Sequence, residues 1–462
     1  MSEPTGPSQT GDDDRERVDS PGHVSLRERV VGFATRRAKG SRNHAQASAV
    51  LAGGYVAQMV FQMGYFLVLT RMLGVEQFGQ FAAALAAINL VSPFAGIGYA
   101  EVALIRVSQD RSETGLWATN SVAATIFLGI PLSLALALVC LLMDSTEWIE
   151  WYLMLGLALA ELTLVRGCFV LARVHQARRE IVRTSMINVA IAAVKAIVAF
   201  ALFVTGQKSM LLLVVLLDVC LLPVLVYLFY AMTRLAPYQG ISWATLRTNL
   251  GLATSFTSGV FSKAVYTDMD KLFLARWTTS EIVGTYAAGY KVLSLAFLPI
   301  RAILEATFPR QVEHAATSVR SCAVFSASLL SANVLLASIL SVAIYVLAPW
   351  APLLLGSDFT DSVAILRIGC ILPVLQAMHY TMGNYLTALG RQAFRATAQV
   401  TVVIVYVAVA WFLIPRYSWH GAIWTSLSCE FLLVVLLGIG CFVSLFRNQP
   451  PSTQTLSGQG DA

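Results

Sequence analysis

Charged side chains are scarce in this sequence of 462 residues: Asp, Glu, Lys and Arg together make up only 13% of it, against about 25% in soluble domains. Hydrophobic residues make up 57%, and the mean hydropathy is +0.68. A soluble globule of this composition lacks the polar side chains needed to cover its surface. The shortage of charge therefore excludes a soluble enzyme and a disordered chain, and it indicates a polytopic membrane protein.

Patterned cysteines, metal motifs and phosphate-binding loops are also missing. The seven cysteines are scattered through apolar stretches with no CxxC pair, which is typical of small hydrophobic residues in helix packing rather than of a disulfide scaffold or a zinc site. No P-loop, serine–histidine constellation or aromatic–basic pattern occurs. We therefore expect no cofactor, no metal, no catalysis and no nucleic-acid partner.

The charges that do occur are concentrated at the N-terminus. Residues 1–45 hold 15 of the 58 charged residues, whereas the 28 residues from Asn43 to Thr70 hold none. Because about 20 apolar residues cross a bilayer as a helix, the first apolar stretch is predicted to act as an uncleaved signal anchor. Residues 1–24 are polar and acidic, which predicts disorder. The basic stretch 25–45 is either an interfacial helix on an anionic leaflet or a solvated tail.

Twelve apolar segments follow along the chain, and each is predicted to be a transmembrane helix. They lie at 47–70, 78–104, 117–142, 149–172, 184–205, 209–232, 250–275, 285–308, 320–347, 361–389, 396–414 and 419–445. The predicted fold is an all-α polytopic membrane protein with about 12 transmembrane helices in two six-helix lobes. Its divisions are a cytoplasmic tail 1–45, an N-terminal lobe 46–232, a cytoplasmic linker 233–249, a C-terminal lobe 250–445 and a cytoplasmic tail 446–462.

The positive-inside rule orients this bundle. With the N-terminal tail in the cytoplasm, thirteen arginines fall in inner loops, against four basic residues in outer loops or at their edges. The inner set is Arg106, Arg111, Arg173, Arg178, Arg179, Arg183, Arg234, Arg247, Arg310, Arg320, Arg391, Arg395 and Arg447, and the outer set is Arg71, Lys208, Arg276 and Arg416. Both termini are therefore expected in the cytoplasm, as an even number of helices requires.

Two stretches that are 205 residues apart match, which predicts an internal repeat. RMLGVEQFGQFAAA begins at Arg71, and RWTTSEIVGTYAAG begins at Arg276. The matched positions include Arg71 with Arg276, Glu76 with Glu281 and Gly79 with Gly284. A second echo pairs QARR at Gln176 with QAFR at Gln392, at an offset of 216. Because one period holds six predicted helices, both halves cross the membrane in the same sense, as parallel repeats do in some transporters.

These motifs resemble a known family. LVLTRMLGVEQFGQFAAALAAINLVSPFAGIGYAEVALIR at 67–106 is similar to the opening of polysaccharide-type, Wzx-like flippases of the multidrug/oligosaccharidyl-lipid/polysaccharide (MOP) superfamily. Later signatures of the same family resemble DMDKLFLARWTTSEIVGTYAAGYKVLSLAFLPI at 268–300, APWAPLLLGSDFTDSVAILRIG at 348–369 and GNYLTALGRQ at 383–392. The resemblance covers roughly residues 45–445.

The resemblance implies a transporter that works by alternating access, with a central cavity lined by the first, second, seventh and eighth helices. Its implied substrate is a lipid-linked (polyprenyl-diphosphate) oligosaccharide, which is turned over to the outer leaflet of the bacterial inner membrane. Membrane lipids, a polysaccharide polymerase and glycosyltransferases are the partners that such a protein is expected to have.

Charges inside membrane helices are costly, so each is a functional candidate. The predicted substrate-binding residues are the cations Lys263, Lys291 and Arg301 on the seventh and eighth helices, and the amides Gln58, Gln62 and Asn89 on the first two. The cations suit a diphosphate, and the amides suit sugar hydroxyls. The alternative for both sets is structural hydrogen bonding between helices. Glu305 follows Arg301 by four residues and is expected to pair with it.

Asp268, Asp270 and Lys271, near the outer end of the seventh helix, form a second candidate site for gating or ion coupling. Asp270 follows Lys263 by seven residues and so shares its helix face, where an acid would neutralise the lysine in the absence of a diphosphate. The alternative is a helix-end salt bridge between Asp268 and Lys271. A metal-binding D-x-D of glycosyltransferases is disfavoured, because the sequence has no soluble domain to hold it.

Four charged residues in the fourth to sixth helices sum to zero charge. They are Glu161, Arg166, Lys195 and Asp218. We interpret them as a structural charge network that holds the first lobe together; the alternative is a proton pathway, since buried acids can bind protons near neutral pH. His379 and Glu430 have no partner that sequence spacing identifies.

Three functions compete for this sequence. The predicted cavity is dominated by cations, which favours a flippase for an anionic headgroup over a multidrug/cation antiporter of the same superfamily. An integral-membrane polysaccharide polymerase or ligase would need a large outer loop with catalytic residues. The longest outer loop predicted here, 348–360, is too short to form a domain.

Overall fold

The computed structural model describes residues 26–143 and 148–446. Every regular element in these ranges is helical. The chain divides into two compact units, Met1–Ala52 and Gly53–Ala462. In the first unit the described residues, from Leu26 onward, are helical. The stretch 1–24, predicted to be disordered, and the C-terminal tail beyond Phe446 lie outside the described residues.

The second unit begins inside α1 (Leu26–Val91). Its other α-helices are α2 (Ile97–Gln109), α3 (Thr114–Met143), α4 (Trp151–Leu159), α5 (Arg166–Ala177), α6 (Ile181–Val204), α7 (Met210–Leu235), α8 (Trp243–Thr248), α9 (Leu250–Trp277), α10 (Ser280–Ala296), α11 (Leu298–Thr317), α12 (Val319–Leu347), α13 (Ala351–Leu355), α14 (Ser362–Gly369), α15 (Leu372–Ala388) and α16 (Gln392–Phe446). Short 3-10 turns are η1 (Ser92–Phe94), η2 (Arg111–Glu113), η4 (Ala348–Trp350) and η5 (Ser357–Phe359), and η3 (Ala160–Val165) is a π-helical turn.

Eight helical stretches in the described residues are long and apolar enough to span a membrane, and the bent pair α14–α15 makes nine. Both α1, which bends at Gly74, and α16, which bends at Ser418, join two of the predicted segments. The predicted segment 250–275 is α9, which is not among the eight because serine, threonine and charged residues lower its hydropathy. The all-helical class is confirmed, and the helix count is compatible with twelve.

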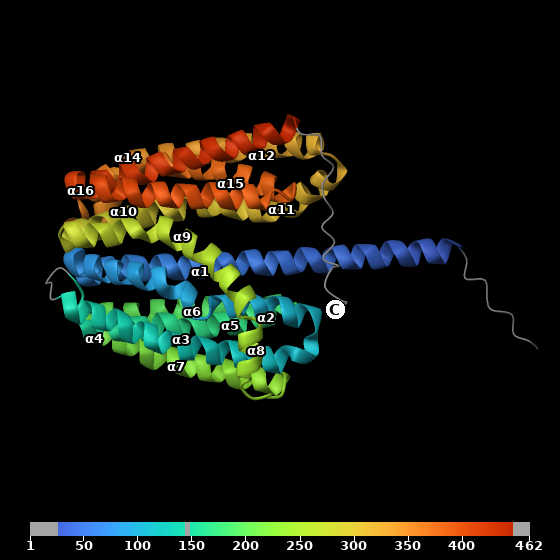
Figure 1. Ribbon diagram of the computed structural model, residues 1–462, viewed down its shortest axis with the longest axis horizontal. Helices are drawn as coiled ribbons and strands as arrows, with labels where there is room; N and C mark the ends of the chain where they lie inside the picture. Colours follow the sequence, from blue (N-terminus) through green and yellow to red (C-terminus); the bar gives the residue numbers. More distant parts are fainter. Residues whose placement is uncertain (1–25, 144–147, 447–462) are drawn as a thin grey trace, which may run out of the picture. The chain divides into compact units, whose positions relative to one another are not determined.

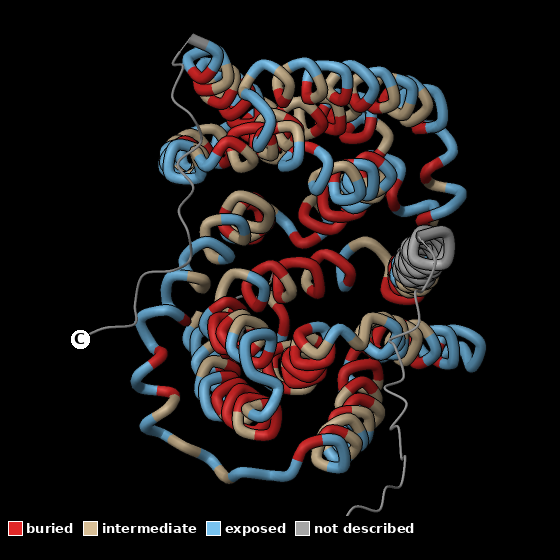
Figure 2. Tube along the Cα trace, turned by 90° about the vertical axis from the view of Figure 1, so that its right-hand side faces the viewer, coloured by how far each residue is buried: buried red, intermediate tan, exposed pale blue. Residues whose placement is uncertain are grey.

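Large apolar side chains cover the outside of the second unit. Leu142 is 75% exposed, and Tyr227, Ile404 and Phe412 are among many others that lie open. Water would solvate such a surface poorly, whereas lipid tails solvate it well. Figure 2 shows buried residues on the inward sides of these helices and exposed residues at the periphery. This is the arrangement of a multi-pass membrane protein.

Within the second unit the helices pack into two groups, which we call the first lobe (α2–α7) and the second lobe (α9–α16). α2–α7 pack on one another, as do α9–α16, and α2 packs against α9 across the two groups (Figure 1). The predicted linker 233–249 contains α8 and is anchored on the first group. The side-chain oxygen of Asn120 accepts a hydrogen bond from the backbone N–H of Ser242 at 2.7 Å, and the Tyr99 hydroxyl donates to the Leu246 carbonyl at 3.1 Å.

The matched glycines of the sequence repeat touch each other. A Cβ added at Gly79 would lie 1.8 Å from the carbonyl oxygen of Ser280, and one added at Gly284 would lie 2.1 Å from the carbonyl oxygen of Val75. Val75 and Ser280 are also 205 residues apart. The contact is therefore the same from either half, as expected for two related repeats that face each other across an approximate twofold axis.

Arg71 binds α13 at the same end of the second unit. Its Nε and Nη2 donate hydrogen bonds to the carbonyl oxygens of Leu354 and Leu353, at 2.9 and 2.7 Å. These carbonyls belong to the last turn of α13, where backbone oxygens have no partner inside the helix. We call this region, formed by Arg71, Gly79, Gly284, Leu353 and Leu354, the latched end.

We expect Gly79→Ala to separate the lobes at the latched end, because its Cβ would overlap the Ser280 carbonyl. Spin labels at positions 76 and 281, both exposed, would report a longer and broader distance distribution. Gly64→Ala is the matched control, since no atom lies within 4 Å of a Cβ added there. Identical distributions in the wild type and Gly79→Ala would contradict the glycine contact.

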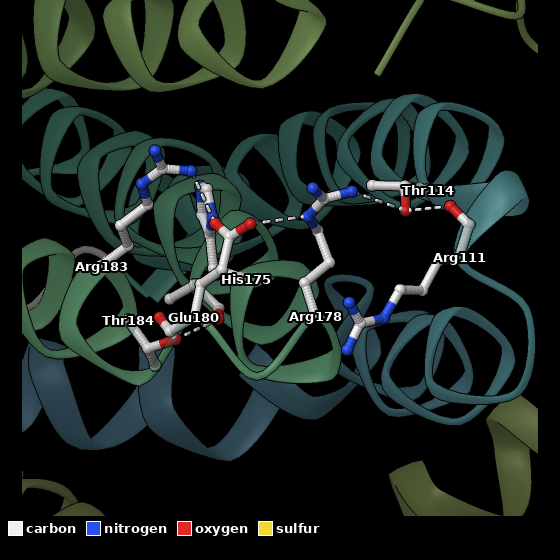
Figure 3. A network of polar contacts seen from close by, with 8 residues as sticks. Arg111, Thr114, His175, Arg178, Glu180, Arg183 and Thr184 are labelled. Carbon is white, nitrogen blue, oxygen red and sulfur yellow. Dashed lines mark hydrogen bonds and ion pairs between the residues drawn. The ribbon is translucent and has the colours of Figure 1, made fainter. Parts of the chain in front are cut away.

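Glu180, in the turn between α5 and α6, gathers three basic side chains (Figure 3). Its carboxylate accepts hydrogen bonds from Arg178 Nε at 2.9 Å and Arg183 Nη1 at 2.7 Å, and it lies 2.8 Å from His175 Nδ1. Although partial burial opposes the effect, these partners lower the pKa of Glu180 to about 2. Arg178 also donates to the Thr114 hydroxyl at 3.4 Å, so the network joins α3, α5 and α6.

Glu180→Gln is expected to lower the thermal stability of the protein and to remove part of its acid sensitivity. A carboxylate whose pKa falls on folding stabilises the folded state above its unfolded pKa of about 4.3, and this stabilisation is lost as the pH falls toward about 2. Thermal melts across this range check the prediction. The control is Glu150→Gln, at an exposed acid whose side chain has no partner among the described residues. Superimposable acid profiles for the wild type and Glu180→Gln would refute this role.

Candidate functional site

Both lysines predicted to bind substrate are exposed on helices of the bundle. Lys263 lies on α9 and Lys291 on α10. In the described parts of the chain, neither side chain has a hydrogen-bond or ion-pair partner. An ammonium group at the bilayer centre costs about 2.5–3.5 kcal/mol even on the most lenient scales. Each lysine therefore needs a polar hollow or a bound anion beside it.

Lys263 belongs to a cationic group that also contains Arg301 and Arg395. The charges of both arginines, and of Glu305, lie close enough to interact with Lys263. Arg301 Nε donates to Glu305 Oε1 at 2.9 Å, the pair that their spacing predicts, and the two side chains are 57% and 52% exposed. The arginine thus keeps donors free for a ligand, and the group has a net positive charge.

Lys291 lies in a different electrostatic environment. The charges nearest to it are those of Asp268 and Lys271 on α9 and of Lys195 on α6. Since α6 belongs to the first lobe and α10 to the second, Lys291 faces across the boundary between the lobes. The structure therefore brings Lys263 and Arg301 together and places Lys291 apart from them, so the three predicted cations do not form a single cluster.

The three predicted amides lie on α1. Gln58 is half-buried, and Gln62 and Asn89 are exposed. Their side chains have no hydrogen-bond partner within the described residues. Their donors and acceptors are therefore available to an external ligand.

The predicted gating residues form a cluster inside the second lobe. Asp270 is 1% exposed and accepts a hydrogen bond from the Tyr286 hydroxyl at 2.6 Å. Lys271 Nζ lies 3.2 Å from a carboxylate oxygen of both Asp268 and Asp270. Asp270 therefore does not face the same space as Lys263, although the two share a helix face. The reason is that α10 and α16 pack against α9 and bury Asp270, whereas Lys263 stays open.

The four charges of the first lobe are only partly paired. Lys195 forms an ion pair with Glu161, which lies on the π-helical turn η3. Arg166 Nη2 donates to the Ser92 hydroxyl at 2.9 Å, and its charge is near that of Glu161. Asp218 also lies near Glu161, and its buried Oδ1 has no hydrogen-bond partner among the described residues.

Lys195→Met should destabilise the protein by about 3 kcal/mol, because it leaves the partly buried carboxylate of Glu161 without its counter-charge. The double variant Lys195→Met/Glu161→Gln should recover most of this loss, since no uncompensated charge remains at the pair. Chemical or thermal unfolding in detergent measures both. A double variant that is no more stable than the single one would show that the ion pair has no such role.

Two hollows lie on different parts of the second unit. The larger, about 910 Å³, lies between α3, α7 and α8; no charged residue lines it, and Phe127, Phe229 and Trp243 are typical of its walls. Such an apolar groove suits lipid chains. The smaller, about 190 Å³, lies between α9, α15 and α16. We call it the α9–α15–α16 pocket, and its polar lining residues are Ser262, Lys263, Tyr266, His379, Tyr380, Arg395 and Gln399.

Sequence reasoning did not assign Arg395 or the pair of His379 and Glu430 to a site. His379 Nδ1 lies 2.7 Å from Glu430 Oε2, and both side chains are buried. Glu430 is 51 residues away in sequence and on another helix, so no spacing rule reports the contact. For Arg395 a signal did exist: it stands directly before the apolar segment 396–414 instead of in the middle of a loop.

Several solved transporter structures have a similar fold. The eukaryotic MATE transporter AtDTX14 matches with a TM-score of 0.60 and 13% identity, over 87% of this chain and 96% of that one. A MOP superfamily transporter from Pyrococcus furiosus gives 0.60 and 13%, over 87% and 94%. A mutant of the Vibrio cholerae MATE transporter VcmN gives 0.55 and 14%, over 87% and 96%. At these identities the likeness defines the class of fold, that of the MOP superfamily transporters.

The family follows from the sequence match. Residues 45–314 match the model of the polysaccharide biosynthesis protein family, which is more than half of the chain. The protein therefore belongs to that family. Among curated proteins, none matches this chain.

Proposed function

We propose that this protein is a membrane transporter that carries a lipid-linked (polyprenyl-diphosphate) oligosaccharide across the bilayer by alternating access. The observation that carries the proposal is the pair of unpartnered cations, Lys263 and Lys291, on helices of a membrane bundle. Membership of the polysaccharide biosynthesis protein family and the transporter fold support it. A bound anion would supply the counter-charge that the described residues do not.

The diphosphate is best accommodated between Lys263 and Arg301. A compact ammonium and a planar guanidinium are the two side chains that bind phosphate most strongly, and the charges of these two residues lie within reach of each other. Glu305 holds the Arg301 guanidinium through Nε alone, which leaves the terminal nitrogens for phosphate oxygens. Lys291 then meets the cargo at a second point, next to the first lobe.

Charge also separates this proposal from a multidrug/cation antiporter of the same superfamily; one of the structural neighbours is a multidrug resistance MATE family transporter. An antiporter for cations needs acids that face its substrate. Here Asp270 is buried against Tyr286, and Glu161 is paired with Lys195. The two unpartnered charges described in the second lobe, those of Lys263 and Lys291, are positive, which favours an anionic cargo.

The latched end would face the outside of the cell. By the positive-inside rule, both termini lie in the cytoplasm, and Arg71 and Arg276 lie on the opposite, outer side. Because the latched end contains Arg71, the described conformation would be closed on its outer side. The bacterial inner membrane is the proposed location. Membrane lipids, a polysaccharide polymerase and glycosyltransferases are the proposed partners, since the cargo is built on one side of the membrane and extended on the other.

Asp268, Asp270 and Lys271 are proposed to act in gating, by linking the movement of the two lobes to substrate binding, or in coupling an ion to transport. Lys271 is held by both acids, and both Asp268 and Lys271 lie close enough to Lys291 for their charges to interact. A cargo anion at Lys291 would therefore change the electrostatic balance of this cluster. This link provides a physical route from substrate binding to the latched end, where Ser280 and Gly284 follow the end of α9.

The double variant Lys263→Ala/Lys291→Ala is expected to fold and to reach the membrane, yet to fail to deliver its glycan to the cell surface. Removing the two cations breaks no side-chain hydrogen bond or ion pair within the described residues, whereas the anionic headgroup loses two charge-assisted interactions. Surface glycan staining, normalised to membrane expression, measures the effect.

Lys208→Ala is the matched control, because Lys208 is an exposed lysine in the turn before α7. Normal surface glycan from a well-expressed double variant would overturn the proposed role of the two lysines. Loss of surface glycan in Lys208→Ala as well would also overturn this role, because the loss would then not be specific to Lys263 and Lys291.

A further inference from the structure

The described lining of the α9–α15–α16 pocket contains basic side chains and no carboxylate. We propose that the pocket binds one sugar of the cargo that carries a carboxylate, as a uronic acid does, with Arg395 as its charged ligand. This inference rests on the proposed function, because it assigns a subsite for the glycan part of the same substrate.

Arg395 is held in place by the lobe before any ligand arrives. Its Nη1 donates to the Thr387 hydroxyl at 2.8 Å and to the Gly383 carbonyl at 3.4 Å. A Cβ added at Gly383 would lie 3.1 Å from Arg395 Nε, so the absence of a side chain there makes room for the guanidinium. Its remaining N–H groups have no partner among the described residues, and Lys263 lines the same pocket. A preorganised guanidinium with free N–H groups is a site for a carboxylate.

Among the described residues, the two acids whose charges reach lining residues of the pocket, Glu305 and Glu430, do not line it. Glu430 does not line it, whereas His379 does, and His379 Nδ1 lies 2.7 Å from the Glu430 carboxylate. Gln376 Nε2 lies 3.3 Å from the other carboxylate oxygen. In the described lining there is no carboxylate to repel an anion, and Glu305, whose charge reaches Lys263, is paired with Arg301.

A sugar fits this pocket better than a diphosphate does. The diphosphate of a lipid-linked glycan is attached to a lipid at one end and to sugars at the other. If it occupied this pocket, both the lipid and the sugars would have to extend out of a small space within one lobe. The volume of about 190 Å³ corresponds to about six water molecules, which is comparable with a single sugar ring. Gln399, Ser262 and Tyr266 offer hydrogen bonds to hydroxyl groups, and Tyr266 and Tyr380 offer aromatic faces.

Binding of small probes to the full-length protein in lipid nanodiscs tests this inference. The probes are methyl glucuronide, the neutral methyl glucoside and inorganic pyrophosphate, followed by titration calorimetry or ligand-observed NMR. The wild type is expected to bind the glucuronide at least about tenfold more tightly than the glucoside, and Arg395→Gln should remove this preference, because a charge-assisted contact is lost. Gly383→Ala, which keeps the charge but crowds Nε, should weaken glucuronide binding as well.

Arg391→Gln is the matched control: it removes the same charge at the residue directly before the same helix, and Arg391 does not line the pocket. Equal affinity for glucuronide and glucoside, an equal loss in the control, or displacement of glucuronide by pyrophosphate from one shared site would each overturn the inference. The proposed function fails separately, if pyrophosphate binding is absent or does not depend on Arg301 while glucuronide binding persists.

Discussion

The hydrocarbon core of a bilayer offers no hydrogen bond to a charged group, and this constraint governs the structure. A charge there must be paired inside the protein or face a polar space. In the first lobe the lysine is paired inside the protein, because Lys195 forms an ion pair with Glu161. The second lobe contains lysines of both kinds. Lys271 is paired with two aspartates, while Lys263 and Lys291 are exposed without partners in the described chain. It is at the residues left open, and not at those that are paired, that we propose the ligand binds.

Much of the fold is readable from the sequence because lipid imposes simple rules. A span of about 20 apolar residues has to be a helix, so the predicted apolar segments are helical in the structure, although 78–104 is divided between α1 and α2 and 285–308 between α10 and α11. The repeat is readable because its two glycines cannot be replaced without a clash. Gly79 lies against the Ser280 carbonyl and Gly284 against the Val75 carbonyl, too close for any side chain. The pair of Arg301 and Glu305 follows from spacing within one helix.

The candidate site was harder to predict, because sequence spacing shows which residues share a helix face but not which helix covers that face. Asp270 and Lys263 share a face of α9, yet the first is buried and the second is open. The contact between His379 and Glu430 and the position of Arg395 in a pocket depend on how α9, α15 and α16 come together. These are properties of packing between helices, and they appear only in three dimensions.

The central claim is that an anionic, diphosphate-linked headgroup binds at the exposed cations of the second lobe. The most direct measurement is a cryo-EM structure of the protein with a polyprenyl-diphosphate disaccharide in nanodiscs. We predict density for the diphosphate within hydrogen-bonding distance of Lys263 and Arg301. A headgroup bound elsewhere, for example on the apolar groove between α3 and α7, with Lys263 and Arg301 unoccupied, would contradict the account.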